Sequence, residues 1–166
     1  LFCVCGHVAR PGVYEEPVSI TLRELIEKAG GVRNGNKLKA VIPGGISAKI
    51  LTAGEIDVAM GFDSLRNAGS MAGSGGVIVM DETTCMIKAL ESAAKFFADE
   101  SCGKCFPCRL GMTHLLDIIE QIEIEYSGEA ANLDVAPITV ATLKGLLESV
   151  SEIGSSLPLQ TGYIVH

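Results

Sequence analysis

The sequence predicts an α+β protein in which a small β-grasp (ubiquitin-like) domain precedes an α-helical bundle. The first third of the 166 residues alternates short apolar runs with Pro and Gly turns, which is typical of strands. The second half instead places apolar residues at helical spacing. We predict a β-grasp domain over 1–55, a glycine-rich connection with one strand over 56–82, and a helical bundle over 83–166.

The first elements are two extended runs, 1–8 and 12–18, which flank a Pro-Gly turn and predict a hairpin. Cys3 and Cys5 share one face of the first run because side chains alternate along a strand. They could be a ligand pair, but we interpret them as buried strand thiols, which are more common. His7 is given the same structural interpretation.

The next elements are a helix and two strands. Thr21 and Glu24 form a capping box ahead of an apolar helical face that ends at Gly30. Strands are predicted at 39–42 and 49–51, on either side of a Pro-Gly-Gly turn. A hairpin, one helix and two further strands predict a small sheet with the helix packed across it.

The segment 69–76 is rich in glycine and precedes a predicted strand at 77–80. A phosphate-binding loop would lie between a strand and a helix and would be followed by Lys-Ser or Lys-Thr, and neither condition is met. Close backbone packing or a tight turn is therefore the favoured role of this segment.

Three amphipathic helices are predicted after this strand, with apolar faces over about 86–97, 115–126 and 139–153. Cys85, at the first turn of the first helix, is interpreted as a small buried residue. The residues expected on the inward face of the second helix are Leu115, Ile118, Ile119, Ile122 and Tyr126.

A cysteine-rich turn joins the first two of these helices. Cys102, Cys105 and Cys108 have the spacing C-x2-C-x2-C, so a short turn can point all three sulfurs at one centre. Thiolates are the soft ligands that zinc and iron–sulfur clusters prefer. A cluster is favoured over zinc, because structural zinc sites have two separated ligand pairs and no second pair is present. Disulfides are disfavoured without a signal peptide or a suitable spacing.

The cysteine turn lacks a fourth cysteine at ferredoxin spacing, since Met112 occupies that position. A fourth ligand would come from elsewhere. His114 could supply a nitrogen, although a single histidine on a helix is more often solvated or hydrogen-bonded.

Three residues around the cysteines affect the electrostatics of such a site. Pro107 suits the first helical position, so the second helix is predicted to begin at Cys108 with free backbone N–H groups aimed at the cluster. Lys104 and Arg109 would add positive charge that eases reduction, or they are ordinary surface residues.

Composition excludes several classes of partner. The net charge of −7 argues against nucleic acid and anionic membrane surfaces, both of which need a basic face. No apolar run approaches the roughly 18 residues needed to span a bilayer, so no membrane insertion is expected and a cytoplasmic location is predicted. The sequence begins with an apolar run at Leu1, and we expect this start to be internal to a longer protein.

Four motifs together resemble a known family. They are Gly-His-Val-x-x-Pro-Gly-Val-Tyr-Glu at 6–15, Ala-Val-Ile-Pro-Gly-Gly at 40–45, Gly-Ser-Gly-Gly-Val-Ile-Val-Met-Asp at 73–81 and Glu-Ser-Cys-Gly-Lys-Cys-x-Pro-Cys-Arg at 100–109. In this order they resemble the C-terminal half of the NADH-binding flavoprotein subunit of NADH:quinone oxidoreductase (complex I). Related subunits occur in NAD-linked hydrogenases and formate dehydrogenases.

The resemblance implies a soluble-ligand-binding β-grasp domain followed by a bundle that holds a [4Fe–4S] cluster. It implies that Cys102, Cys105 and Cys108 are three of the ligands, and that the cluster passes electrons from FMN, reduced by NADH, to further iron–sulfur carriers. FMN and NADH are expected on an upstream domain or a partner chain, so this chain is not expected to oxidise NADH alone. Expected partners are subunits of an oxidoreductase complex, including a thioredoxin-like or ferredoxin-like iron–sulfur subunit.

The sequence departs from the family at the fourth ligand. The family has a cysteine in a Ser-Leu-Cys-like stretch, where this chain has Pro158 in Ser155-Ser-Leu-Pro-Leu-Gln160. A [4Fe–4S] cluster with an incomplete protein ligand set, or a [3Fe–4S] cluster, is therefore expected. The alternative is a redox-silent scaffold that docks partner subunits through a degenerate cluster site.

Overall fold

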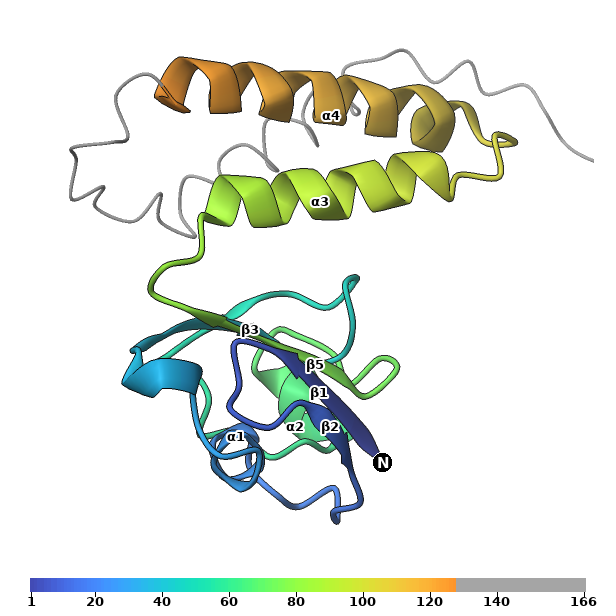
Figure 1. Cartoon of the computed structure of the whole chain (residues 1–166). Coiled ribbons are helices and arrows are strands. Elements are labelled where there is room, and N and C mark those ends of the chain that lie inside the picture. Colours follow the sequence, from blue (N-terminus) through green and yellow to red (C-terminus); the bar gives the residue numbers. More distant parts are fainter. Residues whose placement is uncertain (128–166) are drawn as a thin grey trace, which may run out of the picture. The chain divides into compact units, whose positions relative to one another are not determined.

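The computed structural model describes residues 1–127 and the side chains of residues 1–122 (Figure 1). The chain divides into two compact units, Leu1–Cys85 and Met86–His166, and the second is described as far as Ser127. The helix predicted at 139–153 and the position of Pro158 lie outside the described residues.

The first unit contains a mixed five-stranded sheet in the order β2-β1-β5-β3-β4. Its strands are β1 (Phe2–Gly6), β2 (Gly12–Tyr14), β3 (Leu38–Ile42), β4 (Leu51–Thr52) and β5 (Gly76–Asp81). β1 pairs parallel with β5, and the other neighbours pair antiparallel. The hairpin of β1 and β2 and the predicted β-grasp arrangement are confirmed.

The strand β5 lies in the middle of this sheet, between β1 and β3. The sequence placed it in a connection that follows a domain ending at residue 55. Val77 and Val79 of β5 are fully buried in the same core as the other strands. The compact unit consequently extends to Cys85. Without β5 the sheet would be split into two separate strand pairs, β2-β1 and β3-β4.

The helix α1 (Leu22–Lys28) begins at the predicted capping box. The Thr21 hydroxyl accepts the backbone N–H of Glu24 at 3.2 Å, and the Glu24 carboxylate accepts the backbone N–H of Thr21 at 2.8 Å. This satisfies two N–H groups that the first turn would otherwise leave unpaired. Leu25 is fully buried, so its truncation to Ala would cost about 2–5 kcal/mol.

A short helix, α2 (Phe62–Asn67), and a 3-10 turn, η1 (Arg33–Gly35), complete the first unit. Both α1 and α2 cover one face of the sheet (Figure 1). The core between the sheet and these helices includes Phe2, Val4, Leu22, Leu25, Val41, Leu51, Leu65, Val77 and Val79. The sequence did not predict α2, whose six residues are too few to show a helical period.

The prediction that Cys3 and Cys5 are buried is wrong, because both side chains are exposed. Phe2 and Val4 point into the core, so the alternation along β1 places the two cysteines on the opposite face. Gly76 lies opposite Cys3 in β5 and has no side chain to cover it.

The glycine-rich segment packs closely against the turn after β3, as the sequence predicted. Gly73 has a φ of +45°, and a β-carbon at this position would overlap the carbonyl oxygen of Gly44. Ser74 donates its backbone N–H to that same oxygen at 3.1 Å. Only glycine combines this close approach with a positive φ at no steric cost.

The second unit begins with α3 (Met86–Asp99) and α4 (Phe106–Ser127), which pack against each other. Ala94 of α3 and Ile119 of α4 are buried. Ile118 was predicted on the inward face and is 39% exposed. The inward stripe of α4 runs instead through Met112, Leu115, Leu116 and Ile119. Cys85, predicted to be buried, is also exposed.

Candidate metal centre

The cysteine turn connects α3 to α4. The end of α3 is continued by two backbone hydrogen bonds, from Glu100 N–H to the Phe96 carbonyl at 2.9 Å and from Ser101 N–H to the Ala98 carbonyl at 3.3 Å. Gly103 then reverses the chain with a φ of +71°. The first two cysteines of the motif lie in this turn, and the third lies in the first turn of α4.

The backbone of the turn is held by side chains at both of its ends. Gly103 donates its N–H to the Ser101 hydroxyl at 3.3 Å and accepts a hydrogen bond at its carbonyl from Nη1 of Arg109 at 3.4 Å. Arg109 also donates its backbone N–H to the Cys105 carbonyl at 2.9 Å. Because the turn is already formed, less conformational entropy would be lost when a ligand binds to it.

The start of α4 differs from the prediction by half a turn. The helix begins at Phe106, so Pro107 and Cys108 both lie within its first turn. Proline is tolerated throughout this first turn, because N–H groups there have no intrahelical acceptor. The positive end of the helix dipole therefore lies beside Cys108, where it would stabilise an anionic group bound to the turn.

The three thiols are exposed and form no disulfide. Among the described residues, no group of three or more His, Cys, Asp or Glu side chains is arranged to hold a metal ion. The structure thus places Cys102 and Cys105 in the turn and Cys108 in the first helical turn that follows, but it does not converge their sulfurs on a common centre. As a donor set, three free thiols in a turn braced at both ends fit a soft metal or an iron–sulfur cluster.

The Ser101 hydroxyl lies 3.4 Å from Sγ of Cys108. Sequence analysis missed this contact, since a serine ahead of a cysteine motif is common in turns and no spacing rule distinguishes it. The fold makes the contact by closing the turn between α3 and α4.

The charged neighbours of the turn have different surroundings. Arg109 braces the Gly103 carbonyl, so it is more than a surface residue, whereas the exposed Lys104 lies in the turn itself. Both bring positive charge close to the cysteines, which would stabilise an anionic cluster bound there.

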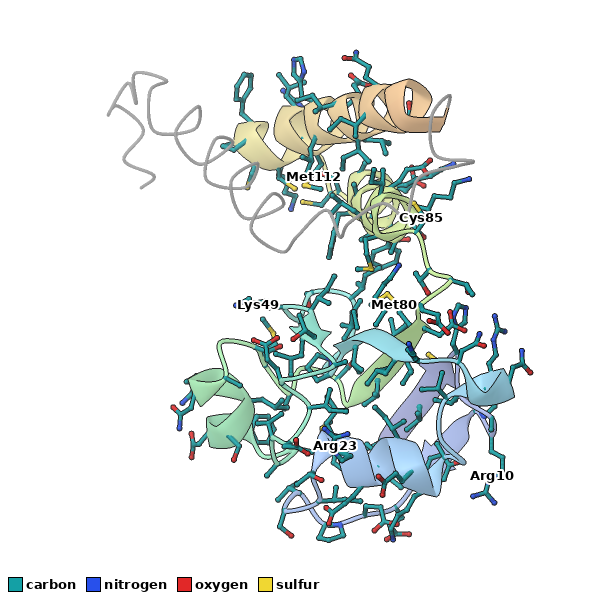
Figure 2. All side chains as sticks on the ribbon, turned by 90° about the vertical axis from the view of Figure 1, so that its left-hand side faces the viewer. Arg10, Arg23, Lys49, Met80, Cys85 and Met112 are labelled. Atoms are coloured by element: carbon teal, nitrogen blue, oxygen red, sulfur yellow. The ribbon has the colours of Figure 1, made fainter. Side chains whose placement is uncertain are left out.

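The other sulfur and nitrogen candidates do not join a ligand group within the described residues. His114 is exposed on α4. Met112, at the position of the ferredoxin ligand, lies between α4 and α3 (Figure 2). The Met112 thioether therefore packs in the interface between the two helices and is not available as the fourth ligand.

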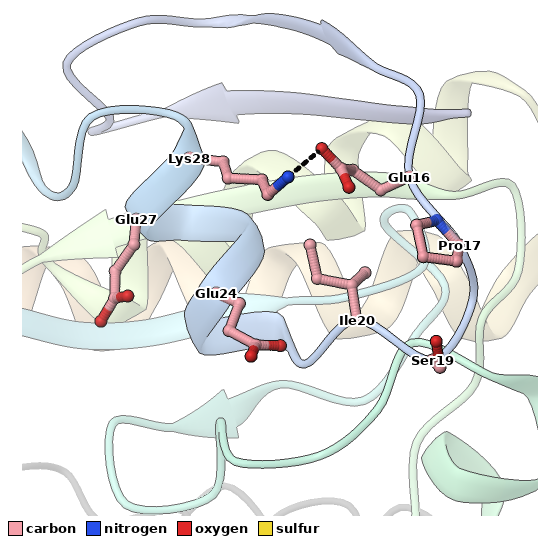
Figure 3. Close-up of a pocket in the computed structure, with 7 residues that line it drawn as sticks. All are labelled: Glu16, Pro17, Ser19, Ile20, Glu24, Glu27 and Lys28. Atoms are coloured by element: carbon pink, nitrogen blue, oxygen red, sulfur yellow. Dashed lines mark hydrogen bonds and ion pairs between the residues drawn. The ribbon is translucent and has the colours of Figure 1, made fainter.

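The first unit carries a shallow depression beside α1 (Figure 3). It is lined by Glu16, Pro17, Ser19, Ile20, Glu24, Glu27 and Lys28. Lys28 pairs with Glu16 at 2.6 Å, and Glu24 is engaged in the helix cap. The depression is acidic and offers no unpaired cation, so it does not suit an anionic ligand.

None of the helices described here combines the length and the apolar character needed to cross a membrane.

Comparisons with known proteins match each of the two units to a different protein family model. Residues 1–79 match the SLBB domain, and residues 88–153 match the iron–sulfur binding region of NADH-ubiquinone oxidoreductase-F. The second match contains all three cysteines of the turn. The chain is therefore similar to an SLBB domain over its first part and to this iron–sulfur binding region over its second.

The similar proteins include F subunits of NADH-quinone oxidoreductases. The chain is 50% identical over 135 residues to the second such protein of Rhizobium meliloti (strain 1021), an alignment that covers 81% of the chain and 32% of that protein. It is 54% identical over 113 residues to the one of Rickettsia rickettsii (strain Sheila Smith), covering 67% of the chain and 27% of that protein. The chain spans about a third of the length of these curated relatives.

A solved structure shows the same fold. The crystal structure of an NAD+-reducing [NiFe]-hydrogenase in the air-oxidized state superposes with a TM-score of 0.65 at 31% identity, covering 74% of this chain and 20% of that one. The predicted resemblance to the C-terminal part of the flavoprotein subunit of NADH:quinone oxidoreductase and related hydrogenases is confirmed.

Proposed function

We propose that this chain is an iron–sulfur electron-transfer module of an NADH dehydrogenase-type or NAD-linked hydrogenase or formate dehydrogenase complex. The observation that carries the proposal is the turn of three free, exposed thiols within the region that matches an iron–sulfur binding model. Cys102, Cys105 and Cys108 would hold the cluster, which supplies one-electron transfer when bound.

The residues of the turn prepare the site for an anionic cluster. Gly103 gives the chain its reversal, Arg109 braces the turn, and the N-terminal end of α4 adds positive potential. Lys104 contributes a further charge. These features stabilise thiolates and favour the more negative, reduced state of a bound cluster.

Electrons would reach the cluster from FMN reduced by NADH, with both bound outside residues 1–166. They would leave to further iron–sulfur carriers in partner subunits, including a thioredoxin-like or ferredoxin-like one, in the cytoplasm. The relatives are named as subunits, which supports assembly with partners. In this role the first unit supplies none of the three cysteines proposed to hold the cluster.

The proposed cluster is a [4Fe–4S] form with one corner not held by a protein thiolate, or a [3Fe–4S] form. Three cysteines lie in the turn, and Pro158 has no side-chain donor. A corner held by water or a protein oxygen is easily lost, so the cluster would interconvert between four-iron and three-iron states.

Anaerobic reconstitution of the full chain tests the electron-transfer proposal. Iron and sulfide analysis should show a cluster, and dithionite followed by a mild oxidant should reduce and reoxidise it reversibly in EPR spectra. A chain that stays colourless and iron-free after careful reconstitution overturns the proposal.

A redox-silent scaffold is the second candidate, and one observation favours it. The three sulfurs do not converge on one centre in the described structure. A scaffold would co-purify with partner subunits while carrying no iron, whereas a relay would carry a reducible cluster in the same complex.

A further inference from the structure

We propose that Ser101 is a positioning residue that donates its hydroxyl proton to the Cys108 thiolate and so raises the reduction potential of the bound cluster. This inference rests on the proposed function, because it concerns a ligand of the proposed cluster. It assigns a role to a residue that is not one of the three cysteines.

The direction of this hydrogen bond follows from the proton count. Ser101 Oγ lies 3.4 Å from Cys108 Sγ, a normal hydrogen-bond distance to sulfur. The same oxygen accepts the backbone N–H of Gly103 at 3.3 Å. A metal-bound thiolate has no proton to give, so the single hydroxyl proton of Ser101 is directed to the sulfur.

The position of Ser101 is set by the backbone on both sides. Its own N–H donates to the Ala98 carbonyl at 3.3 Å, which extends the last turn of α3. On the other side, Gly103 is held between the Ser101 hydroxyl and the Arg109 guanidinium. The hydroxyl is therefore placed by the fold and is not a freely rotating surface group.

The same geometry argues against Ser101 as the missing fourth ligand. A group bound to a different iron must stand well apart from Sγ of Cys108, whereas Ser101 Oγ is in hydrogen-bond contact with it. Ligation would also require a hydroxyl to lose its proton, which a free serine does not do near neutral pH. Ser101 acts through Cys108 and leaves the fourth position open.

Hydrogen bonds to ligand sulfurs withdraw electron density from the thiolate. They stabilise the reduced, more negative cluster more than the oxidised one and make the reduction potential less negative. Ser101→Ala should therefore shift the potential to a more negative value. Ser101→Thr keeps the hydroxyl and should restore it.

The test uses the full chain, reconstituted anaerobically and titrated with mediators while EPR reports the reduced cluster. Ser92→Ala, an exposed serine of α3 outside the turn, is the matched control. We expect the Ala variant to bind the wild-type amount of iron at a more negative potential, and the Thr and Ser92 variants to match the wild type. Pulsed ENDOR in H2O and D2O should show an exchangeable proton near the cluster that the Ala variant lacks.

The outcomes separate this inference from the proposed function. A wild-type chain that takes up no cluster overturns both. A loaded wild-type chain whose potential is unchanged in Ser101→Ala overturns this inference alone. Conversion of the cluster from a four-iron to a three-iron form in Ser101→Ala would make Ser101 a ligand, which also contradicts it. If the Ala variant does not fold, absence of the exchangeable proton in the wild-type spectrum contradicts the inference.

Discussion

Nδ1 of His7 lies 2.7 Å from Oδ1 of Asp81, at the end of the central strand. Asp81 is fully buried, and its carboxylate also accepts hydrogen bonds from Asn36 Nδ2 at 2.9 Å and from the Thr83 hydroxyl at 2.6 Å. The Arg33 guanidinium lies 4.0 Å away. The carboxylate thus joins β1, η1 and the residues that lead out of the sheet, with its desolvation offset by hydrogen bonds.

The first prediction concerns acid stability. Hydrogen bonds from Thr83 and Asn36, with a further one from His7, hold the pKa of Asp81 well below its usual range. A carboxyl with a lowered folded-state pKa stabilises the fold above its unfolded pKa of about 4, and this contribution is lost as the pH falls toward the folded value. The free energy of unfolding in urea should therefore fall steeply below about pH 4.

Asp81→Asn should flatten this pH dependence, because an amide does not titrate. Asp57→Asn is the matched control. The pKa of Asp57 is also lowered, by its hydrogen bond with Arg23, but the pair is exposed and screened by solvent, so a smaller change is expected. Equal pH slopes for the wild type and Asp81→Asn would contradict the role given to Asp81.

The second prediction concerns the exposed thiols of β1. Since Cys3 and Cys5 lie on the outer face, Cys3→Ser or Cys5→Ser should change the free energy of unfolding by no more than about 0.5 kcal/mol. Both thiols should react with iodoacetamide in the folded chain, and iron content should be unchanged. Slow alkylation with a cost of about 2 kcal/mol or more would show that these side chains are buried.

The third prediction concerns the contact between two glycine turns. Gly73→Ala should destabilise the first unit by at least about 1 kcal/mol, because the added carbon meets the Gly44 carbonyl at a positive φ. Gly54→Ala is the control, since a β-carbon there meets no atom within 4 Å. Urea denaturation of the two variants measures the difference. Equal stabilities would mean that the Gly44 contact is not required.

The local features of the fold could be predicted, and the long-range ones could not. The hairpin and the Thr21–Glu24 capping box depend on neighbouring residues alone. The pairing of β5 with β1 and β3 joins residues far apart in sequence, so the predicted domain end at 55 missed it. For the same reason the sequence could show that Cys3 and Cys5 share a face but not which face α1 and α2 cover.

The candidate site also has features that the sequence could predict and features that it could not. The spacing of the three cysteines predicted the turn, and Pro107 predicted a helix start close to the observed one. The contact of Ser101 with Cys108 and that of Arg109 with Gly103 depend on how the turn closes. Neither could be read from spacing.

The fourth prediction concerns the missing ligand. If Pro158 occupies the position of the family's fourth cysteine, Pro158→Cys should complete the ligand set and stabilise the four-iron form against air. In the unmodified chain, brief oxidation should produce a three-iron EPR signal that reverts when iron and reductant are added. A four-iron cluster that survives air unchanged without the substitution would mean that another ligand completes the site.

The central claim is that the three cysteines of the turn hold an iron–sulfur cluster. Mössbauer counting of iron in the chain reconstituted with 57Fe tests it most directly, when Cys102→Ser, Cys105→Ser and Cys108→Ser are compared with Cys85→Ser, an exposed thiol outside the turn. We predict about three to four cluster irons per chain in the wild type and in Cys85→Ser, and a loss of most of this iron in each of the other three variants. Full iron content in all three turn variants, or no cluster iron in the wild type, would contradict the claim.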